Sequence, residues 1–301
     1  SKLLGVSIGT IRKAVDKLEN INVLYRQHGK GTFVSNYGFD NRLINKLTKK
    51  AQNKFTRILL PESNDERVLQ AAINVSKKKI AQIILLGDKT KTTQQLDKLN
   101  IAPNVGLKYL DPKDKQLNNI YAEILYKKRK HKGMSLVDAK VMLDDDTVFA
   151  MLALENGDVD GVVTGAITPS QTVLSNALRI IGVADNSKLV SSFFLMLFDA
   201  KHRIYGGEMI FSDCAMNVNP DADELAGIAK SAYKSANNYF DVKPKIAMLS
   251  FSTNKVTKHT QVEKVSTATS ILRKMLPEVD IIGNVQLDAA LDSNVLKTKS
   301  P

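Results

Sequence analysis

Long apolar runs are missing from this sequence of 301 residues. Its longest apolar stretch, VSSFFLMLF at residues 190–198, has the length of a strand, whereas a helix that crosses a membrane needs about 18–20 apolar residues. The first ten residues also lack the charged head, apolar run and cleavage site of a secretory signal. We therefore expect neither a membrane span nor a membrane partner.

Cysteine and histidine are scarce as well. Cys214 is the one cysteine, which excludes an internal disulfide framework and is typical of a reducing cytoplasm. The histidines are scattered at positions 28, 131, 202 and 259, without a metal-ligand spacing such as H-E-x-x-H. The sequence thus predicts a cytoplasmic protein that holds no metal.

Acidic residues are rare in the first part of the chain. Residues 1–56 carry 11 Lys and Arg against three acids, a net charge of +8, out of +12 for the whole chain. A basic segment on a nearly balanced body favours an anionic partner, nucleic acid first. A solvated basic surface remains the alternative on charge alone.

The first 36 residues show the pattern of a helix followed by a hairpin. Ser7 is a candidate N-cap. Apolar residues recur after it at helical spacing, at positions 11, 15 and 18. Two short β-prone runs, 22–27 and 31–35, flank a basic, glycine-rich turn. In a winged helix, such a helix enters the major groove of DNA and the hairpin contacts its backbone.

These residues resemble GntR-type transcriptional regulators. The resemblance rests on LGVSIGTIRKA at 4–14 and GKGTFV at 29–34, and it covers about the second half of such a domain. It implies a partial winged helix over residues 1–36, with DNA as a partner. The residues expected to contact DNA are Ser7, Thr10, Arg12, Lys13, Arg26 and Lys30.

From about residue 40 the pattern changes to alternating helices and strands. Helices are expected at 41–54, 65–79, 119–133, 136–143, 147–157, 172–182, 221–240 and 261–276. Strands are expected at 57–62, 81–87, 108–111, 160–166, 189–198, 208–213, 245–253 and 280–286. This alternation predicts an α/β fold with a largely parallel sheet.

Two of these strands end in loops rich in hydroxyl groups. The first loop contains Thr164, Gly165, Thr168 and Ser170, and the second contains Ser250, Ser252, Thr253 and Lys258. Ligands of parallel sheets bind beyond the carboxyl ends of strands, and helix N-termini suit phosphate or carboxylate groups. Simple helix capping explains either loop alone. Two such loops in one protein favour an anion site.

Three other features have plainer explanations. The triplet Asp144-Asp145-Asp146 precedes a helix and is expected to cap it rather than to hold a metal. Cys214 follows a strand and is expected to be a buried structural thiol. The basic run KKRKHKG at 127–133 suits the end of a helix, although it could also form a wall of the anion site.

The body resembles phosphate acetyltransferases (phosphotransacetylases). The resemblance extends from about residue 40 to 301. Its motifs are LLPE with DERVLQAA, RKHKG, DVDGVVTGA with ALRIIG, VSSFFLMLF, FSDCAMNVNP, AMLSFST and LDAALD. The residues in these motifs resemble those of acetyl-transferring enzymes more than those of butyryl-transferring enzymes. The resemblance implies a two-domain α/β fold of the isocitrate/isopropylmalate dehydrogenase type, divided at 37–186 and 187–301.

The same resemblance implies a chemistry. Acetyl-CoA and phosphate are interconverted with acetyl phosphate and CoA, without metal or resident cofactor, in a homodimer when the chain is complete. The CoA thiol attacks the acetyl carbonyl, an aspartate acts as base, and arginines bind the phosphate. Arg129 matches one of these arginines, and its planar fork suits phosphate.

The sequence departs from that family in three ways. Ser175 stands where the second arginine of the site is expected, and we count it among the substrate-binding positions. Residues 254–257, NKVT, replace the usual KGSA and lose a glycine. The segment that bears the aspartate and a serine–arginine pair is expected after Pro301. We therefore expect this chain to be a fragment whose catalysis is impaired or absent.

Three hypotheses follow. The chain is a phosphate acetyltransferase with a regulatory N-terminal segment, or a transcriptional regulator whose transacetylase-like domain senses acetyl phosphate or CoA without turnover. The third hypothesis is an artificial fusion of two genes. We favour the first, because the enzyme-like region is several times longer than the regulator-like one.

Overall fold

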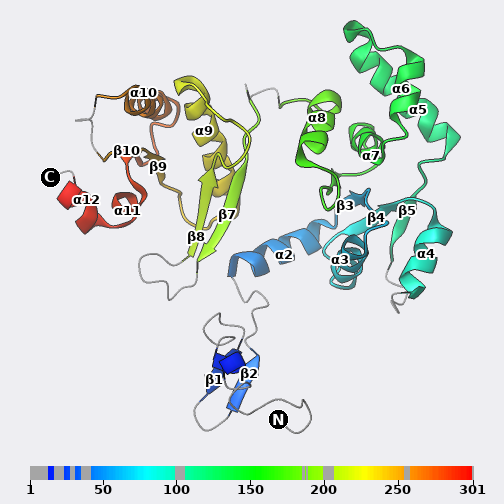
Figure 1. Ribbon diagram of the computed structural model, residues 1–301, viewed down its shortest axis with the longest axis horizontal. Coiled ribbons are helices and arrows are strands. Elements are labelled where there is room, and N and C mark those ends of the chain that lie inside the picture. The colour runs from blue at the N-terminus through cyan, green and yellow to red at the C-terminus, as the bar shows by residue number, and fades with distance from the viewer. Residues whose placement is uncertain are drawn as a thin grey trace. The chain divides into compact units, whose positions relative to one another are not determined.

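The computed structural model describes residues 13–16, 24–27, 31–34, 42–98, 106–184, 187, 189–198, 207–253 and 258–299. The chain divides into two compact units, residues 1–48 and 49–301. Figure 1 traces the elements of both. Each unit is described by itself below.

The first unit contains the predicted hairpin. Strands β1 (Leu24–Gln27) and β2 (Gly31–Val34) are antiparallel, with Leu24 opposite Val34 and Gln27 opposite Gly31. Residues 13–16 are helical, within the helix predicted after Ser7. The rest of that predicted helix lies outside the described residues. Helix α2 (Arg42–Lys54) begins in this unit and ends in the next.

A four-stranded parallel sheet opens the second unit. Its strands are β3 (Arg57–Leu60), β4 (Gln82–Leu86), β5 (Lys108–Leu110) and β6 (Gly161–Val162), in the order β5-β4-β3-β6. Helix α3 (Glu66–Lys77) connects β3 to β4, and α4 (Lys89–Lys98) follows β4. Both the sheet and its parallel pairing agree with the sequence prediction, whereas α4 was not predicted.

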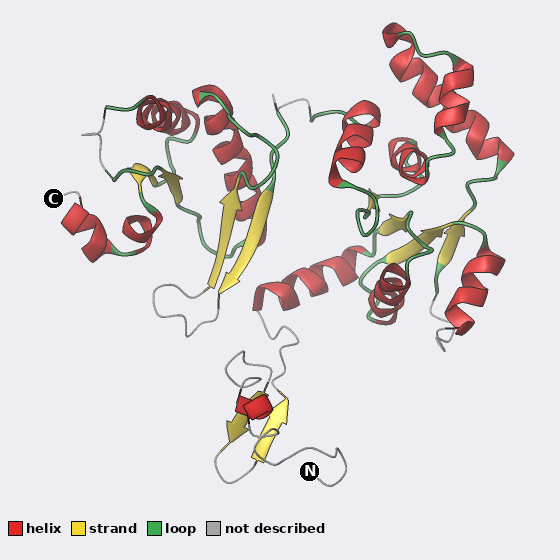
Figure 2. Ribbon diagram, in the orientation of Figure 1, coloured by secondary structure: helices red, strands yellow, loops and turns green. Residues whose placement is uncertain are grey.

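Side chains of the central strands alternate between two apolar cores. Leu59, Ile84 and Leu86 pack into one core, while the neighbouring Ile83 and Leu85 pack into the other. Successive residues of a strand point to opposite faces, so both faces of this sheet are covered, as is usual for parallel sheets. Figure 2 shows helices next to the sheet.

Helices between β5 and β6 build the larger core. They are α5 (Lys115–Arg129), the short 3₁₀ helix η1 (Lys130–Lys132), α6 (Leu136–Met142) and α7 (Asp146–Glu155). Every residue of α7 from Thr147 to Ala153 is buried, because this helix lies inside the core. Helix α8 (Ser170–Ile180) follows β6.

Side chains cap the helices α6 and α7, whereas the predicted cap Ser7 lies outside the described residues. Asp145 caps α7 by accepting hydrogen bonds from the amides of Thr147 and Val148, at 2.7 and 3.1 Å. Ser135 and Asp138 form a reciprocal capping box at the start of α6. The acidic triplet therefore supplies the cap that the sequence predicted.

The remainder of the second unit pairs its strands in two ways. Strands β7 (Phe193–Phe198) and β8 (Gly207–Ser212) are antiparallel, whereas β9 (Ile246–Leu249) and β10 (Ile281–Val285) are parallel. Helices α9 (Ala222–Tyr239) and α10 (Thr260–Met275) pack around a third core, which includes Met248, Ala268 and Leu272. Helices α11 (Leu287–Leu291) and α12 (Ser293–Lys299) come last.

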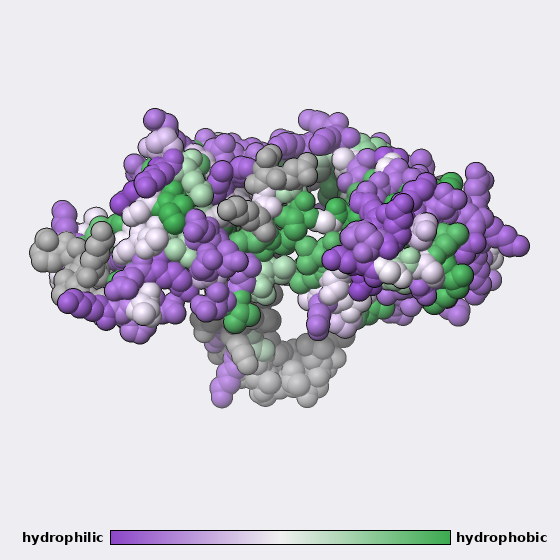
Figure 3. Space-filling view, turned by 90° about the horizontal axis from the view of Figure 1, so that it is seen from above, coloured by the Kyte–Doolittle hydropathy of each residue, from purple (hydrophilic) through white to green (hydrophobic). Residues whose placement is uncertain are grey.

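The surface is mostly hydrophilic, with apolar patches on the face seen in Figure 3. Large exposed apolar side chains include Val163, Ile167 and Phe251, each of which follows the end of a parallel strand. No helix among the described residues is long and apolar enough to cross a membrane.

Candidate functional site

The parallel sheet has a topological switch point between β3 and β6. The chain leaves β3 toward β4 and β5 on one side, and β6 pairs with the other side of β3. Ligands of open α/β sheets bind at such a point, beyond the carboxyl ends of the strands. Two loops meet that requirement, the β3–α3 loop (61–65) and the β6–α8 loop (163–169).

The carboxylate of Glu62 joins these two loops. Its Oε2 accepts hydrogen bonds from the amides of Gly165 and Ala166, at 3.0 and 2.8 Å. Its Oε1 accepts from the amides of Ile167 and Thr168, at 3.0 and 2.7 Å. Four successive backbone donors thus surround one side chain.

These contacts keep Glu62 ionised. Its burial, with 6% of the residue exposed, acts to raise the pKa, but the amides of Thr168, Ala166 and Ile167 outweigh this and lower the pKa to about 2. The hydroxyl of Thr168 contributes in the same direction. At neutral pH the β6–α8 loop is therefore wrapped around a fixed negative charge.

This arrangement decides what the first predicted loop can offer to a ligand. The amides of Gly165 and Thr168 already donate hydrogen bonds to Glu62, so only side chains of this loop remain available to a ligand. The Oγ1 atom of Thr164 is buried and finds no hydrogen-bond partner among the described residues. Ser170 is exposed at the first turn of α8. The assignment of this loop to a substrate stays a prediction.

A second link fixes the same loop from α3. Arg67 donates through Nη2 to the carbonyl oxygen of Ala166 at 3.0 Å, and it pairs with Asp65 at 2.7 Å. Asp65 caps α3, and hydrogen bonds from Arg67 lower its pKa to about 2. Glu62 therefore holds this loop through four backbone amides, and Arg67 holds it through the carbonyl of Ala166.

Arg129, the predicted phosphate ligand, ends helix α5. The residue is half-buried, and no hydrogen bond or ion pair joins its side chain to another described residue. Its neighbour Lys128 is bound to Glu155 at 2.7 Å. A cation that forms no ion pair within the protein can bind an external anion, so Arg129 remains a candidate phosphate ligand.

The position of the second expected arginine lies on α8. Ser175 is exposed there. Arg179, one turn further on, donates to the sulfur of Met142 at 3.9 Å and is turned toward α6. The structure thus places the Arg179 side chain against α6.

The second predicted loop follows β9. The hydroxyl of Thr253 accepts a hydrogen bond from the amide of Gln286 at 3.1 Å, at the carboxyl end of β10. Ser250 and Ser252 lie in the same loop and are half-buried. Lys258 is exposed before α10, and residues 254–257 lie outside the described part of the chain. The ends of two parallel strands thus bring Thr253 and Gln286 together.

Asp213 organises the segment that follows β8. It accepts hydrogen bonds from the hydroxyl of Ser192 and from the amide of Asn217, the latter at 2.6 Å. Burial acts to raise its pKa, but these bonds lower the pKa well below the usual range. Cys214 donates to Ser192 at 3.5 Å and is half-buried, less enclosed than the sequence predicted.

Most of the predicted DNA contacts lie outside the described residues. These are Ser7, Thr10, Arg12 and Lys30. Lys13 is exposed in the helical residues 13–16, and Arg26 lies in β1 opposite Thr32. The proposed DNA-contact surface therefore stays a prediction.

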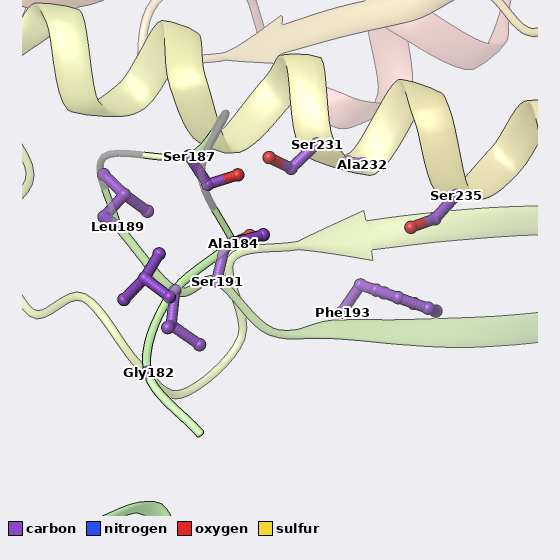
Figure 4. A pocket seen from close by; sticks show the side chains of 11 residues that line it. Gly182, Ala184, Ser187, Leu189, Ser191, Phe193, Ser231, Ala232 and Ser235 are labelled. Atoms are coloured by element: carbon purple, nitrogen blue, oxygen red, sulfur yellow. The ribbon is translucent and has the colours of Figure 1, made fainter. Parts of the chain in front are cut away.

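A small open pocket of ≈ 240 Å³ lies between α9 and the described residues 182–184, 187, 189–191 and 193. Figure 4 shows Ser231 projecting from α9 toward Ser187, and Ser235 projecting from the same helix toward the strands near Phe193. The described residues that line it include serines but no charged side chain. Across the described chain no cluster of His, Cys, Asp or Glu could hold a metal ion.

Sequence reasoning missed Glu62, Asp213 and Gln286. Only Glu62 had a local signal, since a carboxylate directly after a central strand lies at the ligand-binding edge of a parallel sheet. The partners of Asp213 and Gln286 come from distant segments, which a single sequence does not connect.

The fold and this edge define an α/β protein whose candidate ligand site is built from loops at the ends of parallel strands. The sequence profile of the family described as "Phosphate acetyl/butaryl transferase" matches residues 42–301. The chain belongs to this family.

Individual relatives agree with this assignment. A phosphate acetyltransferase of Clostridium acetobutylicum is 38% identical over 259 residues, which are 86% of this chain and 78% of the relative. Two solved structures each have a TM-score of 0.76, an EutD phosphotransacetylase from Staphylococcus aureus (32% identical) and a phosphotransacetylase from Streptococcus pyogenes (34% identical). Each alignment covers 86% of this chain and 77% of the solved one.

Proposed function

We propose that the chain is a phosphate acetyltransferase, which converts acetyl-CoA and phosphate to acetyl phosphate and CoA. The observation that carries the proposal is the match over residues 42–301, together with the 38% identity to a protein of that name. In the reverse direction the CoA thiol attacks the acetyl carbonyl carbon. A C–S bond forms, the C–O bond to phosphate breaks, the thiol proton passes to a base and phosphate leaves.

Residues from three parts of the chain are proposed to carry this chemistry. Arg129 is proposed to bind the phosphate group through its guanidinium fork. Thr164, Gly165, Thr168 and Ser170 are proposed to shape the substrate site, with Thr164 and Ser170 as the hydroxyl donors. Ser250, Ser252, Thr253 and Lys258 are proposed as substrate contacts from the β9 end. The active form is proposed to be a cytoplasmic homodimer of two α/β domains, 37–186 and 187–301.

Turnover of acetyl-CoA and phosphate tests the proposal directly. We expect the chain to form acetyl phosphate and to use acetyl-CoA in preference to butyryl-CoA. We also propose that Ser175 lowers the activity, because a hydroxyl carries no charge to stabilise a phosphate. Ser175→Arg should then raise kcat/KM about tenfold or more, given the strength of charge-assisted contacts in a site. Absence of turnover in both the parent chain and Ser175→Arg would count against catalysis by this chain.

A second candidate function rests on the first unit. The hairpin β1–β2 occurs where a wing was predicted, and residues 1–56 carry a net charge of +8. We propose that this segment binds DNA. Retention of a duplex by the whole chain should weaken steeply between about 50 and 200 mM salt.

The double variant Arg12→Ala/Lys13→Ala should weaken that retention and flatten its salt dependence, because two phosphate contacts are lost. The matched control is Lys127→Ala/Lys132→Ala, which removes the same charge from the second unit. Equal DNA binding by the two double variants would count against a DNA-binding role for this segment.

A further inference from the structure

The β6–α8 loop has an unusual relation to a single side chain. Backbone amides at a loop and helix start commonly form a concave cradle for an external anion. Here the amides of residues 165–168 all donate to Glu62, at 2.7–3.0 Å. The carboxylate of Glu62 therefore already occupies this cradle.

The position of this loop depends little on strand pairing. Strand β6 has two residues, and its ladder with β3 consists of Ile58 opposite Gly161 and Leu59 opposite Val162. Side chains fasten β6 beyond both of its ends. Asp160 accepts three hydrogen bonds from Arg57 at the amino end, and Glu62 binds the loop at the carboxyl end.

The loop in turn carries two hydroxyl groups at its ends. Thr164 stands immediately before the four bound amides, and its buried Oγ1 has no partner among the described residues. A buried hydroxyl without a partner costs about 1–3 kcal/mol, so its retention fits a site that a ligand or water completes. Ser170 begins α8, whose Pro169 cap position supplies no side-chain hydrogen bond.

We propose that Glu62 is a positioning residue of the substrate site, which holds residues 165–168 so that Thr164 and Ser170 are presented to the phosphate-bearing substrate. The inference rests on the proposed phosphate acetyltransferase function. Glu62 itself does not touch the substrate, because its oxygens are occupied by amides and its charge would repel phosphate.

The variant Glu62→Gln tests this role with a minimal change of shape. A glutamine keeps one acceptor oxygen for two amides, but its NH₂ group faces the other two donors. We expect the loop to shift and KM for phosphate to rise roughly tenfold or more, since a displacement of about 1 Å can cost about 100-fold. The matched control, Asp160→Asn, makes the same chemical change at the other end of β6 and should lower Tm without altering KM.

The measurements separate positioning from stability. Steady-state kinetics with varied phosphate are taken well below the Tm of each variant. If Glu62→Gln lowers Tm but keeps KM for phosphate within twofold of the parent, the positioning role is wrong. Should Glu62→Gln fail to fold, Glu62→Asp replaces it. Its shorter side chain keeps the charge but cannot reach all four amides, and the same KM criterion applies.

Failure of the enzymatic proposal remains distinguishable. If the parent chain shows no turnover, calorimetric binding of acetyl phosphate replaces KM as the readout. Binding that weakens at least tenfold in Glu62→Gln and not in Asp160→Asn supports positioning without catalysis. Equal binding by the parent and Glu62→Gln, or no binding by the parent, overturns the inference.

Discussion

Replacing Arg129 with alanine is expected to lower kcat/KM of the parent chain by about 10²–10³, which is roughly 3–4 kcal/mol of transition-state stabilisation. The reason is that Arg129 ends α5 as a half-buried cation without a described partner, and its proposed ligand is the phosphate that carries charge during transfer. Steady-state turnover of acetyl-CoA with varied phosphate measures the effect.

Two further variants sharpen this test. Arg129→Lys keeps the positive charge but loses the planar fork, so its loss should be smaller than that of alanine. Lys127→Ala removes a cation from the same helix end, where Lys127 is exposed and pairs with Glu123 at 3.4 Å. Because such surface pairs contribute little, this control should leave kcat/KM unchanged. An Arg129→Ala enzyme within threefold of the parent would contradict the role given to Arg129.

Replacing Gly283 with alanine should destabilise the second unit by about 3 kcal/mol, as insertion of atoms into a tightly packed core does. A Cβ at Gly283 would lie 2.2 Å from Oγ1 and 2.9 Å from Cβ of Thr269. Thr269 is 4% exposed and donates to the carbonyl of Val265 at 2.7 Å. Strand β10 and helix α10 would have to separate, which urea denaturation detects.

The control for Gly283→Ala is the same change at Gly227. That glycine lies inside α9, and apart from its chain neighbours and the backbone of its own helix no described atom comes within 4 Å of the added Cβ. Alanine there should raise the free energy of unfolding by about 0.5–1 kcal/mol, because it favours the helix. Adding Thr269→Gly to Gly283→Ala should recover part of the loss. Equal stability of Gly283→Ala and the parent would disprove the close contact between β10 and α10.

Sequence patterns predicted the fold where local signals are strong. Apolar strands such as 57–60 and 82–86, and helices with clear caps such as α6 and α7, were anticipated within a few residues. Helix α4 was missed because its sequence is polar and buries only Thr92 and Leu96. A helix held by so few contacts gives little periodic signal.

The sequence prediction of a largely parallel sheet does not extend to β7 and β8, which are antiparallel. The segment that connects them, residues 199–206, is shorter than the dozen or so residues that a parallel crossover needs. The length of the connection therefore indicates antiparallel pairing of these two strands. The alternation of helices and strands, on which the prediction rested, does not take this length into account.

The candidate site was only partly predictable. Hydroxyl groups at the ends of strands β6 and β9 marked both loops, because strand ends are visible in the sequence. The sequence did not reveal that the amides of the first loop bind Glu62, since about 100 residues separate the partners. Long-range pairing of a carboxylate with backbone donors leaves no local pattern.

The β6–α8 loop is exposed to solvent, yet its backbone is held by hydrogen bonds. Gly165, Ala166 and Ile167 are exposed, yet each of their amides is bound to Glu62. Fixing a free loop around a substrate costs about 1–2 kcal/mol of conformational entropy per residue. In this chain the loop loses that conformational entropy when the protein folds rather than when a substrate binds. The loop is therefore preorganised for a ligand.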